Sequence, residues 1–187
     1  MINPATKIET QRLILEKYTY ELQQDLYECF LLNEKRLQNS FPTSVRLCLD
    51  ETKGYNYIQS KVFDFNARTS FAYAIIIKNA RQYIGQVSIT KIDEQIPMAE
   101  LAYFIDKRYE GKGMMSEAFE AILEELFVKH HFEKLSLHMA TNNSRSLKLA
   151  ETHGFMREGL HRKCFRNYYN ELIDVYSYGI LKAEYFK

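Results

Sequence analysis

The chain has 187 residues, of which 46% are hydrophobic and 26% are charged, and its formal net charge is +1 at pH 7. These values favour a single folded domain over residues 1–187 and exclude a disordered chain. The near-neutral charge gives no reason to expect direct binding to nucleic acid or to an anionic membrane surface. The three cysteines, Cys29, Cys48 and Cys164, are widely spaced, so neither a disulfide framework nor a metal site is expected.

The first half of the chain predicts a strand, two helices and a hairpin. Residues 12–16 form a short apolar run typical of a strand, and Thr19 is a candidate cap for a helix over about 20–32. Residues 39–50 are expected to be irregular, and Asp50 could cap a second helix. The β-rich runs 71–77 and 83–89 predict a hairpin, in which Gly85 indicates a bulge or a close approach by another group.

The second half alternates strands with helices. A strand is predicted over 98–105, followed by a long helix whose apolar residues from Met115 to Phe127 recur every three or four positions. A strand over 135–139 and a helix over 143–153, ended by Gly154, come next. Two strands, 155–165 and 172–181, complete a mixed α/β fold on one central sheet. No apolar run is long enough to cross a bilayer, and the start of the chain has no signal-like pattern, so a cytoplasmic location is expected.

A glycine pair marks the junction between the strand over 98–105 and the long helix. Gly111 and Gly113 can adopt positive φ and leave the backbone N–H groups open at the positive end of the helix, where an anion can approach. Lys112 adds a positive charge. The alternative is a tight turn that binds nothing, since short glycine motifs are common. The pattern is neither a dinucleotide fingerprint nor a P-loop.

Two other places carry polar side chains that could do chemistry. Asn143 and Ser146 lie at the start of a predicted helix, where capping alone would account for Asn143. Glu100 interrupts an apolar strand, so it either faces solvent or lines a polar cleft; the rarity of buried, unpaired Glu favours solvent. The histidines, including His130 and His131, are expected to be surface or capping groups.

Taken in order, these motifs resemble the GNAT superfamily of acetyl-CoA-dependent N-acetyltransferases, and more closely the branch that contains the ribosomal-protein N-terminal acetyltransferases. The resemblance is close from Glu100 to Tyr178 and present over residues 9–15, and it is loose over about 35–70. It implies a mixed, mostly antiparallel sheet flanked by helices, and acetyl-CoA as cosubstrate.

The resemblance also implies residue roles. The pyrophosphate of CoA would be held at Arg108, Gly111 and Gly113, with Lys112, Met114, Met115 and Ser116 along the same rim. The pantetheine arm would pair with Tyr103, Phe104 and Ile105 and contact Asn143. Many members carry a Tyr proton donor where this chain has Ala150, so Ser146 is the first candidate for that role.

The implied reaction is direct attack of a primary amine on the thioester, with Glu100 as the base that acts directly or through a water. A backbone N–H of the strand containing Tyr103 would hold the thioester oxygen. The expected acceptor is a protein N-terminal α-amine of the ribosomal-protein type, while a small-molecule amine as acceptor and an idle acetyl-CoA sensor stay open as alternatives. Residues 33–41 and 166–170 are candidates for the acceptor pocket, although the second could equally be an exposed turn. The sequence does not choose between a monomer and a homodimer.

Overall fold

The computed structural model describes residues 2–187, except for the side chains of residues 51 and 52. Residue 1, which the expected domain includes, lies outside the described part. The described strands are β1 (Lys7–Glu9), β2 (Leu13–Lys17), β3 (Phe71–Ile77), β4 (Gln82–Asp93), β5 (Met98–Ile105), β6 (Lys134–Ala140), β7 (Met156–Arg166) and β8 (Leu172–Leu181). The helices are α1 (Gln23–Leu37), α2 (Pro42–Cys48), α3 (Glu51–Ala67), α4 (Met114–Glu124), α5 (Ser144–Thr152) and α6 (Lys182–Tyr185), with α4 continued by wider π-type turns over Glu125–Lys129.

One sheet of eight strands runs through the described residues in the order β1-β2-β3-β4-β5-β6-β8-β7. Every neighbouring pair is antiparallel except β5 and β6, which are parallel and are joined by a crossover through α4. The prediction of a mixed, mostly antiparallel sheet flanked by helices is therefore confirmed.

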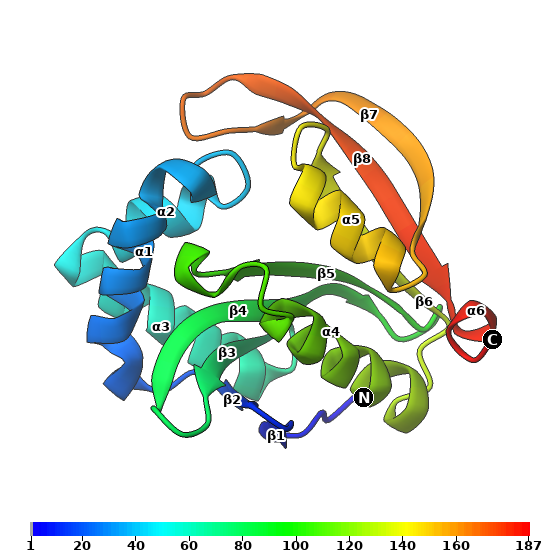
Figure 1. Cartoon of the computed structure of the whole chain (residues 1–187), viewed down its shortest axis with the longest axis horizontal. Coiled ribbons are helices and arrows are strands. Elements are labelled where there is room, and N and C mark those ends of the chain that lie inside the picture. Colours follow the sequence, from blue (N-terminus) through cyan, green and yellow to red (C-terminus); the bar gives the residue numbers. More distant parts are fainter. Residues whose placement is uncertain (1) are drawn as a thin grey trace.

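Helices cover both faces of this sheet. Helices α1–α3 gather on one side of the molecule in Figure 1, where Phe30 and Ile58 pack with Ala74 of β3. Helix α4 covers the other face, where Phe119 packs with residues such as Leu101 of β5. Because β3 is buried between both layers, its sequence is a nearly continuous apolar run.

The parallel pair β5 and β6 separates part-way along its length. Their register runs from Met98 opposite Lys134 to Leu101 opposite Leu137 and stops there. Beyond this point β5 continues to Ile105 beside β4, and β6 continues to Ala140 beside β8. The sheet therefore forks in its middle, and this fork positions the site described below.

Two acidic residues of α4 and its continuation accept hydrogen bonds from the N-terminal residues and so hold them against this helix. Glu117 accepts hydrogen bonds from the Arg12 backbone N–H at 2.7 Å and from Thr10 Oγ1 at 2.6 Å. Glu125, which is 2% exposed, accepts from the Ala5 N–H at 2.9 Å and from Lys129 Nζ at 2.7 Å. Burial by itself raises the pKa of Glu125, but these bonds outweigh it and the pKa lies below its ordinary value.

Local chemistry explains both the agreement with the predicted elements and the differences from them. Asp50 caps α3 by accepting from Lys53 N at 3.0 Å, as expected. A bulge falls beside Gly85, where a Cβ would lie 2.3 Å from the Phe104 carbonyl oxygen. The expectation of irregular structure over 39–50 is wrong, because α2 forms there with Pro42 in its first turn, a position that suits proline. The first helix also extends to Leu37, five residues beyond its predicted end.

Candidate active site

A cavity of about 1070 Å³ occupies the fork between β5 and β6. Its walls come from both faces of the sheet: the turn before α4 and the first residues of α5 on one side, and the end of α1, the segment before α2 and strand β7 on the other. It includes most of the residues predicted from the sequence, namely Glu100, Tyr103, Phe104, Ile105, Gly111, Gly113, Met114, Met115, Ser116, Asn143 and Ser146. The tertiary structure thus brings residues separated by up to 46 positions around one space.

The glycine turn has the backbone geometry that its sequence predicts. Gly111 and Gly113 have φ values of +70° and +71°, in the left-handed region that favours glycine. Gly113 is the N-cap of α4, so the first N–H groups of this eleven-residue helix have no partner within the helix. Both glycines line the cavity, and the positive end of α4 therefore adjoins it.

The open edge of β5 presents backbone groups to the fork. The Asp106 N–H donates to Ile84 O of β4, and Thr90 Oγ1 of β4 donates to Glu100 O, so the even-numbered residues turn toward β4. Tyr103 and Ile105, which alternate with them, turn their backbone groups to the side where β6 has departed. The Ile105 carbonyl already accepts a hydrogen bond from the Arg36 guanidinium.

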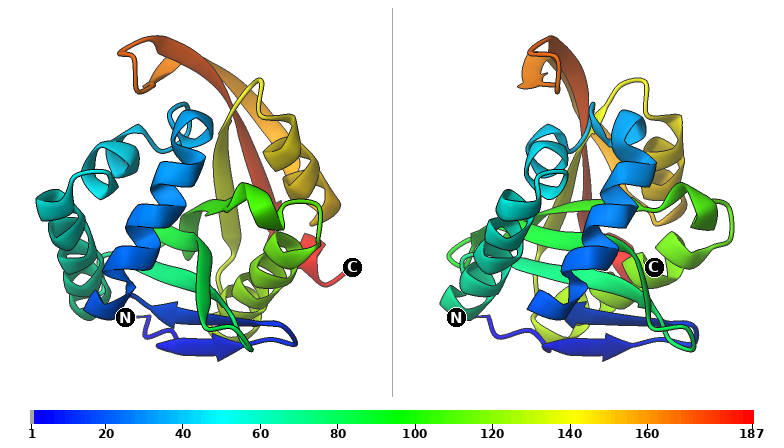
Figure 2. Two further views of the ribbon diagram at one scale, coloured as in Figure 1. Left: turned by 60° about the vertical axis from the view of Figure 1, so that its left-hand side comes forward. Right: turned by 90° about the vertical axis from the view of Figure 1, so that its left-hand side faces the viewer.

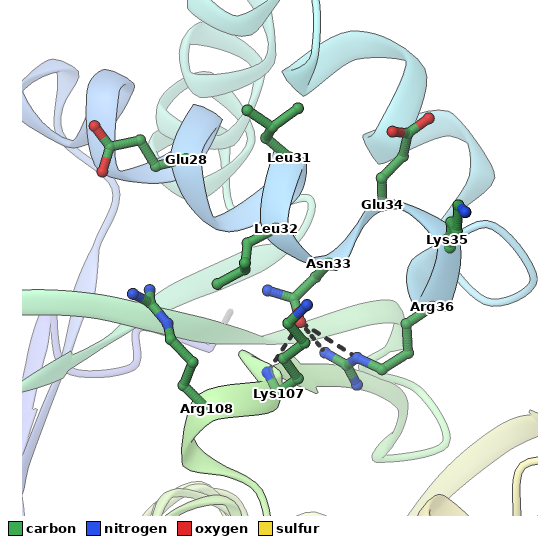
Figure 3. Close-up of a pocket in the computed structure, with 9 residues that line it drawn as sticks. All are labelled: Glu28, Leu31, Leu32, Asn33, Glu34, Lys35, Arg36, Lys107 and Arg108. Carbon is green, nitrogen blue, oxygen red and sulfur yellow. Dashed lines mark hydrogen bonds between the residues drawn. The ribbon is translucent and has the colours of Figure 1, made fainter.

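Two residues predicted at this rim, Arg108 and Lys112, do not line the cavity. Arg108 bonds back to the Asp106 carboxylate through Nε at 2.9 Å and Nη2 at 2.6 Å, and it lines a separate hollow of about 670 Å³ beside α1 (Figure 3). Lys112 lies with its Nζ 5.2 Å from the centre of the Tyr109 ring. Any part that these two residues play at the cavity would come from the backbone or from movement of the side chain.

Asn33 of α1 fixes the start of the turn from the other side. Its Oδ1 accepts from the Lys107 N–H at 2.9 Å and from Arg36 Nη2 at 3.0 Å (Figure 3). Glu110 then joins three segments around the cavity, because it pairs with Arg36 at 2.9 Å and with Arg145 of α5 at 2.8 Å. These bonds hold α1, the turn and α5 together around the fork.

The start of α5 places a hydroxyl group in the cavity. Asn143 caps the helix by accepting from the Ser146 N–H at 3.3 Å, as predicted. Ser146 O accepts from the Tyr103 hydroxyl at 3.2 Å, and burial raises the pKa of that hydroxyl well above its ordinary value. The Tyr103 proton is thus engaged, whereas Ser146 keeps its own hydroxyl beside the cavity. Ala150 is fully buried and offers no polar group.

Glu100 lies in the cleft, so the expectation that it faces solvent is wrong. Its side chain is 17% exposed, and Oε2 accepts from Lys91 Nζ at 2.8 Å and pairs with His138 Nδ1 at 2.8 Å. His138 and His161 both line the cavity, with ring centres 5.5 Å apart. The expectation that the histidines are only surface or capping groups is therefore wrong for this pair. Little in the sequence indicated this pair, because His138 is an isolated histidine within a short predicted strand.

The far end of the cavity is lined by two segments that are distant in sequence, one running from the end of α1 toward α2 and one in β7. Residues 36, 37 and 39–41 line it, and they belong to the segment 33–41 that the sequence suggested for the acceptor pocket. From β7 come His161, Cys164 and Phe165, whereas residues 166–170, which start at the last residue of β7 and continue into the hairpin turn, do not line the cavity. The turn contacts the α1–α2 region, where Tyr168 N donates to Gln38 O at 3.0 Å, and Figure 2 shows the β7–β8 hairpin reaching toward these helices.

Among residues 2–187 the structure contains no cluster of three or more His, Cys, Asp or Glu side chains arranged to hold a metal ion. Within the same described range, no helix is both long and apolar enough to cross a membrane.

Comparison with known proteins assigns the family. The family described as "Acetyltransferase (GNAT) domain" matches residues 12–156, which include β5, the glycine turn, α4 and α5. The chain belongs to the GNAT acetyltransferase family. The matched residues of this GNAT chain thus include the β5 side of the fork and the glycine turn of the candidate site.

Curated relatives of this GNAT chain are distant. An uncharacterized N-acetyltransferase p20 of Bacillus licheniformis is 31% identical over 113 residues, which cover 60% of this chain and 63% of the relative. A putative ribosomal N-acetyltransferase YdaF of Bacillus subtilis is 29% identical over 54% of this chain and 55% of its own. The chain therefore spans less than two thirds of the length of these relatives.

Solved structures share the fold over nearly the whole GNAT chain. A putative ribosomal-protein-serine acetyltransferase from Vibrio cholerae superposes with a TM-score of 0.82 at 21% identity, covering 96% of this chain and 99% of that one. A ribosomal L7/L12 alpha-N-protein acetyltransferase, RimL, in complex with coenzyme A, gives 0.84 at 19% identity, covering 94% and 97%. At this identity the likeness shows the fold alone.

Proposed function

We propose that this protein transfers the acetyl group of acetyl-CoA to a primary amine, and that the amine is the α-amino group at the N-terminus of a protein. The observation that carries the proposal is the fork itself: one cavity joins the positive end of α4 on one side of the sheet to Glu100 on the other. A neighbour of the same fold, the microcin C7 self-immunity acetyltransferase MccE, was solved in complex with acetyl-CoA and AMP, which supports the choice of cosubstrate.

The proposed roles follow the order of groups along the cavity. Backbone N–H groups from Gly113 to Ser116 hold the pyrophosphate, and the open edge at Tyr103 pairs with the pantetheine arm. Asn143 contacts that arm from α5. Positioning the thioester at the fork places the reacting carbon next to Glu100, which draws the proton from the amine either directly or through an intermediate group.

An α-amine is the proposed acceptor because it needs only a modest base. Its pKa is about 8, whereas that of a lysine side chain is about 10.4. Neighbours named as ribosomal-protein-serine and ribosomal-protein-S5-alanine acetyltransferases support a ribosomal-protein N-terminus as the acceptor.

The deciding experiment offers the enzyme acetyl-CoA and matched acceptors, and measures acetylated product by mass spectrometry. Peptides with the N-terminal sequences of ribosomal proteins are compared with the same peptides blocked at the N-terminus but carrying a free lysine, and with small polyamines. Product from the free peptides alone supports the proposal. Product only from lysine or polyamines would overturn the acceptor, and tight acetyl-CoA binding without any product would indicate a sensor.

Ser146 is proposed as the donor that protonates the leaving CoA thiolate, and the chain supplies its own control. Ser144 is an exposed serine at the first position of the same helix and does not line the cavity. Ser146→Ala is expected to lower kcat while the affinity for acetyl-CoA stays the same, and Ser144→Ala is expected to do neither. Equal kcat values for the two variants would remove Ser146 from the reaction.

A further inference from the structure

Four polar side chains from four strands meet on the acceptor side of the fork. Glu100 of β5 pairs through Oε2 with Lys91 of β4 and with His138 of β6, each at 2.8 Å. His161 of β7 stacks edge-on against His138 and bonds through Nε2 to Ser177 Oγ at 3.0 Å. Glu100 and His138 are 38 positions apart in the sequence, so only the register of β5 against β6 brings them together.

His138 lies at the point where the strands separate. The last paired residues are Leu101 and Leu137, so Glu100 sits within the paired region and His138 is the first residue of β6 beyond it. Neighbours of His138 on β6, Leu137 and Met139, face the core on the α4 side, which turns His138 toward the acceptor side. Its side chain is 36% exposed and lines the cavity.

The two ring nitrogens of His138 have different surroundings. Nδ1 is held by the Glu100 carboxylate, whereas Nε2 has no hydrogen-bond partner among the described residues. A histidine whose one nitrogen is fixed by a carboxylate presents the other as a proton acceptor. Carboxylates as a class titrate near pH 4 and imidazoles near pH 6.5, so an imidazole is the better matched base at neutral pH.

We infer that His138 is the group that takes the proton from the acceptor amine, and that Glu100 is a positioning residue that holds its Nδ1–H. This inference rests on the proposed acetyl transfer and specifies the intermediate group through which Glu100 acts. The ammonium form of the acceptor gives one proton to Nε2, and the freed amine nitrogen attacks the thioester carbonyl carbon. The C–N bond forms, the C–S bond breaks with its electron pair on sulfur, and the second nitrogen proton replaces the one that Ser146 gives to the CoA thiolate. The imidazolium then returns its proton to solvent.

The charged and titratable groups that face His138 define the test. They are Glu100 from β5, Lys91 from β4 and His161 from β7, and the Cys164 thiol of β7 lines the same cavity; on β8, Ser177 lies opposite His138. His161 is the matched control, because it is a second imidazole in the same cavity that bonds to a serine and not to Glu100.

The experiment measures kcat/KM from pH 5 to 9 for one α-amine peptide by mass spectrometry of the acetylated product. For wild type, kcat/KM should rise to a plateau with a break between pH 5 and 8, the range in which imidazoles titrate. His138→Gln should lose this break and rise steadily to the amine's own pKa near 8, with kcat/KM at pH 7 lowered by about 10²-fold or more.

Two further variants identify the titrating group. His161→Gln should keep the break, whatever its overall rate. Glu100→Gln should lower the rate and move the break to lower pH, because removal of the negative neighbour disfavours the imidazolium. His138→Asn serves as a second variant, and thermal unfolding and acetyl-CoA affinity confirm that each protein is folded.

Each other outcome overturns the inference. A break that persists in His138→Gln, or that disappears in Glu100→Gln alone, would mean that Glu100 takes the proton without His138. Loss of the break in His161→Gln would assign the proton transfer to His161 instead of His138. If wild type acetylates no amine at all, the proposed function fails and this inference fails with it, whereas an active wild type with an unchanged His138 profile removes the inference alone.

Discussion

Gly113 offers a direct test of where the phosphates bind. A Cβ added there would meet only Arg12 Nη2, at 3.5 Å, so a short side chain fits without a backbone clash. The cost comes from the positive φ of 71°, about 1–2 kcal/mol for most residues and less for Asn and Asp, which tolerate this region. Gly113→Asn and Gly113→Asp have nearly the same shape and differ by one charge, so their comparison isolates electrostatics.

The expected effect of that charge follows from its distance to a bound phosphate. For unit charges about 5 Å apart, the repulsion lies between about 1 kcal/mol in water and about 3 kcal/mol near a protein surface, which corresponds to a loss of affinity between about 5-fold and 150-fold. Isothermal titration calorimetry with acetyl-CoA at low salt should show this difference between the Asp and Asn variants. It should shrink at high salt, because ions screen exposed charges.

Urea unfolding provides the control for this pair of variants. Both proteins should lose a similar, small part of their unfolding free energy, since the backbone strain is the same. Equal acetyl-CoA affinity of the Asp and Asn variants at low salt would refute the placement of the pyrophosphate at this turn.

Three further predictions concern stability. Phe119→Ala, at a fully buried ring, should lower the free energy of unfolding by about 3–5 kcal/mol, measured by urea denaturation; a loss near zero would contradict the packing described for α4. Gly85→Ala should destabilise by about 1–3 kcal/mol because its Cβ would clash with the Phe104 carbonyl, whereas Gly54→Ala, inside α3 with ordinary contacts, should stabilise by about 0.5–1 kcal/mol. The pKa of Glu125 is lower in the folded protein than in the unfolded chain, so its contribution is complete above about pH 5 and is lost as the pH falls through the folded value. Wild type should therefore lose stability on acidification more steeply than Glu125→Gln, and parallel curves would show that this carboxylate is not responsible.

Much of the fold could be predicted because its signals are local. The repeat of apolar residues in α4 follows from the geometry of a helix, and the run of aromatic and β-branched residues in β3 is typical of a buried strand; both signals depend only on nearby residues. The positive φ values at Gly111 and Gly113 could be anticipated for the same reason, since steric limits on φ act within a single residue. Pro42 is a local signal of this kind too, because proline suits the first turn of a helix, so the start of α2 was also predictable from the sequence.

The site depended on contacts that no local pattern contains. The sequence by itself determined the glycine turn, the helix that follows it and the Asn143 cap, because each rests on backbone conformation over a few residues. Only the tertiary structure decided that β5 and β6 part after Leu101, that Arg108 turns back to Asp106, and that Glu100 meets His138. The separation of β5 from β6 and the contact between Glu100 and His138 depend on the register between strands distant in sequence, and a shift of one residue would turn each side chain to the opposite face of the sheet.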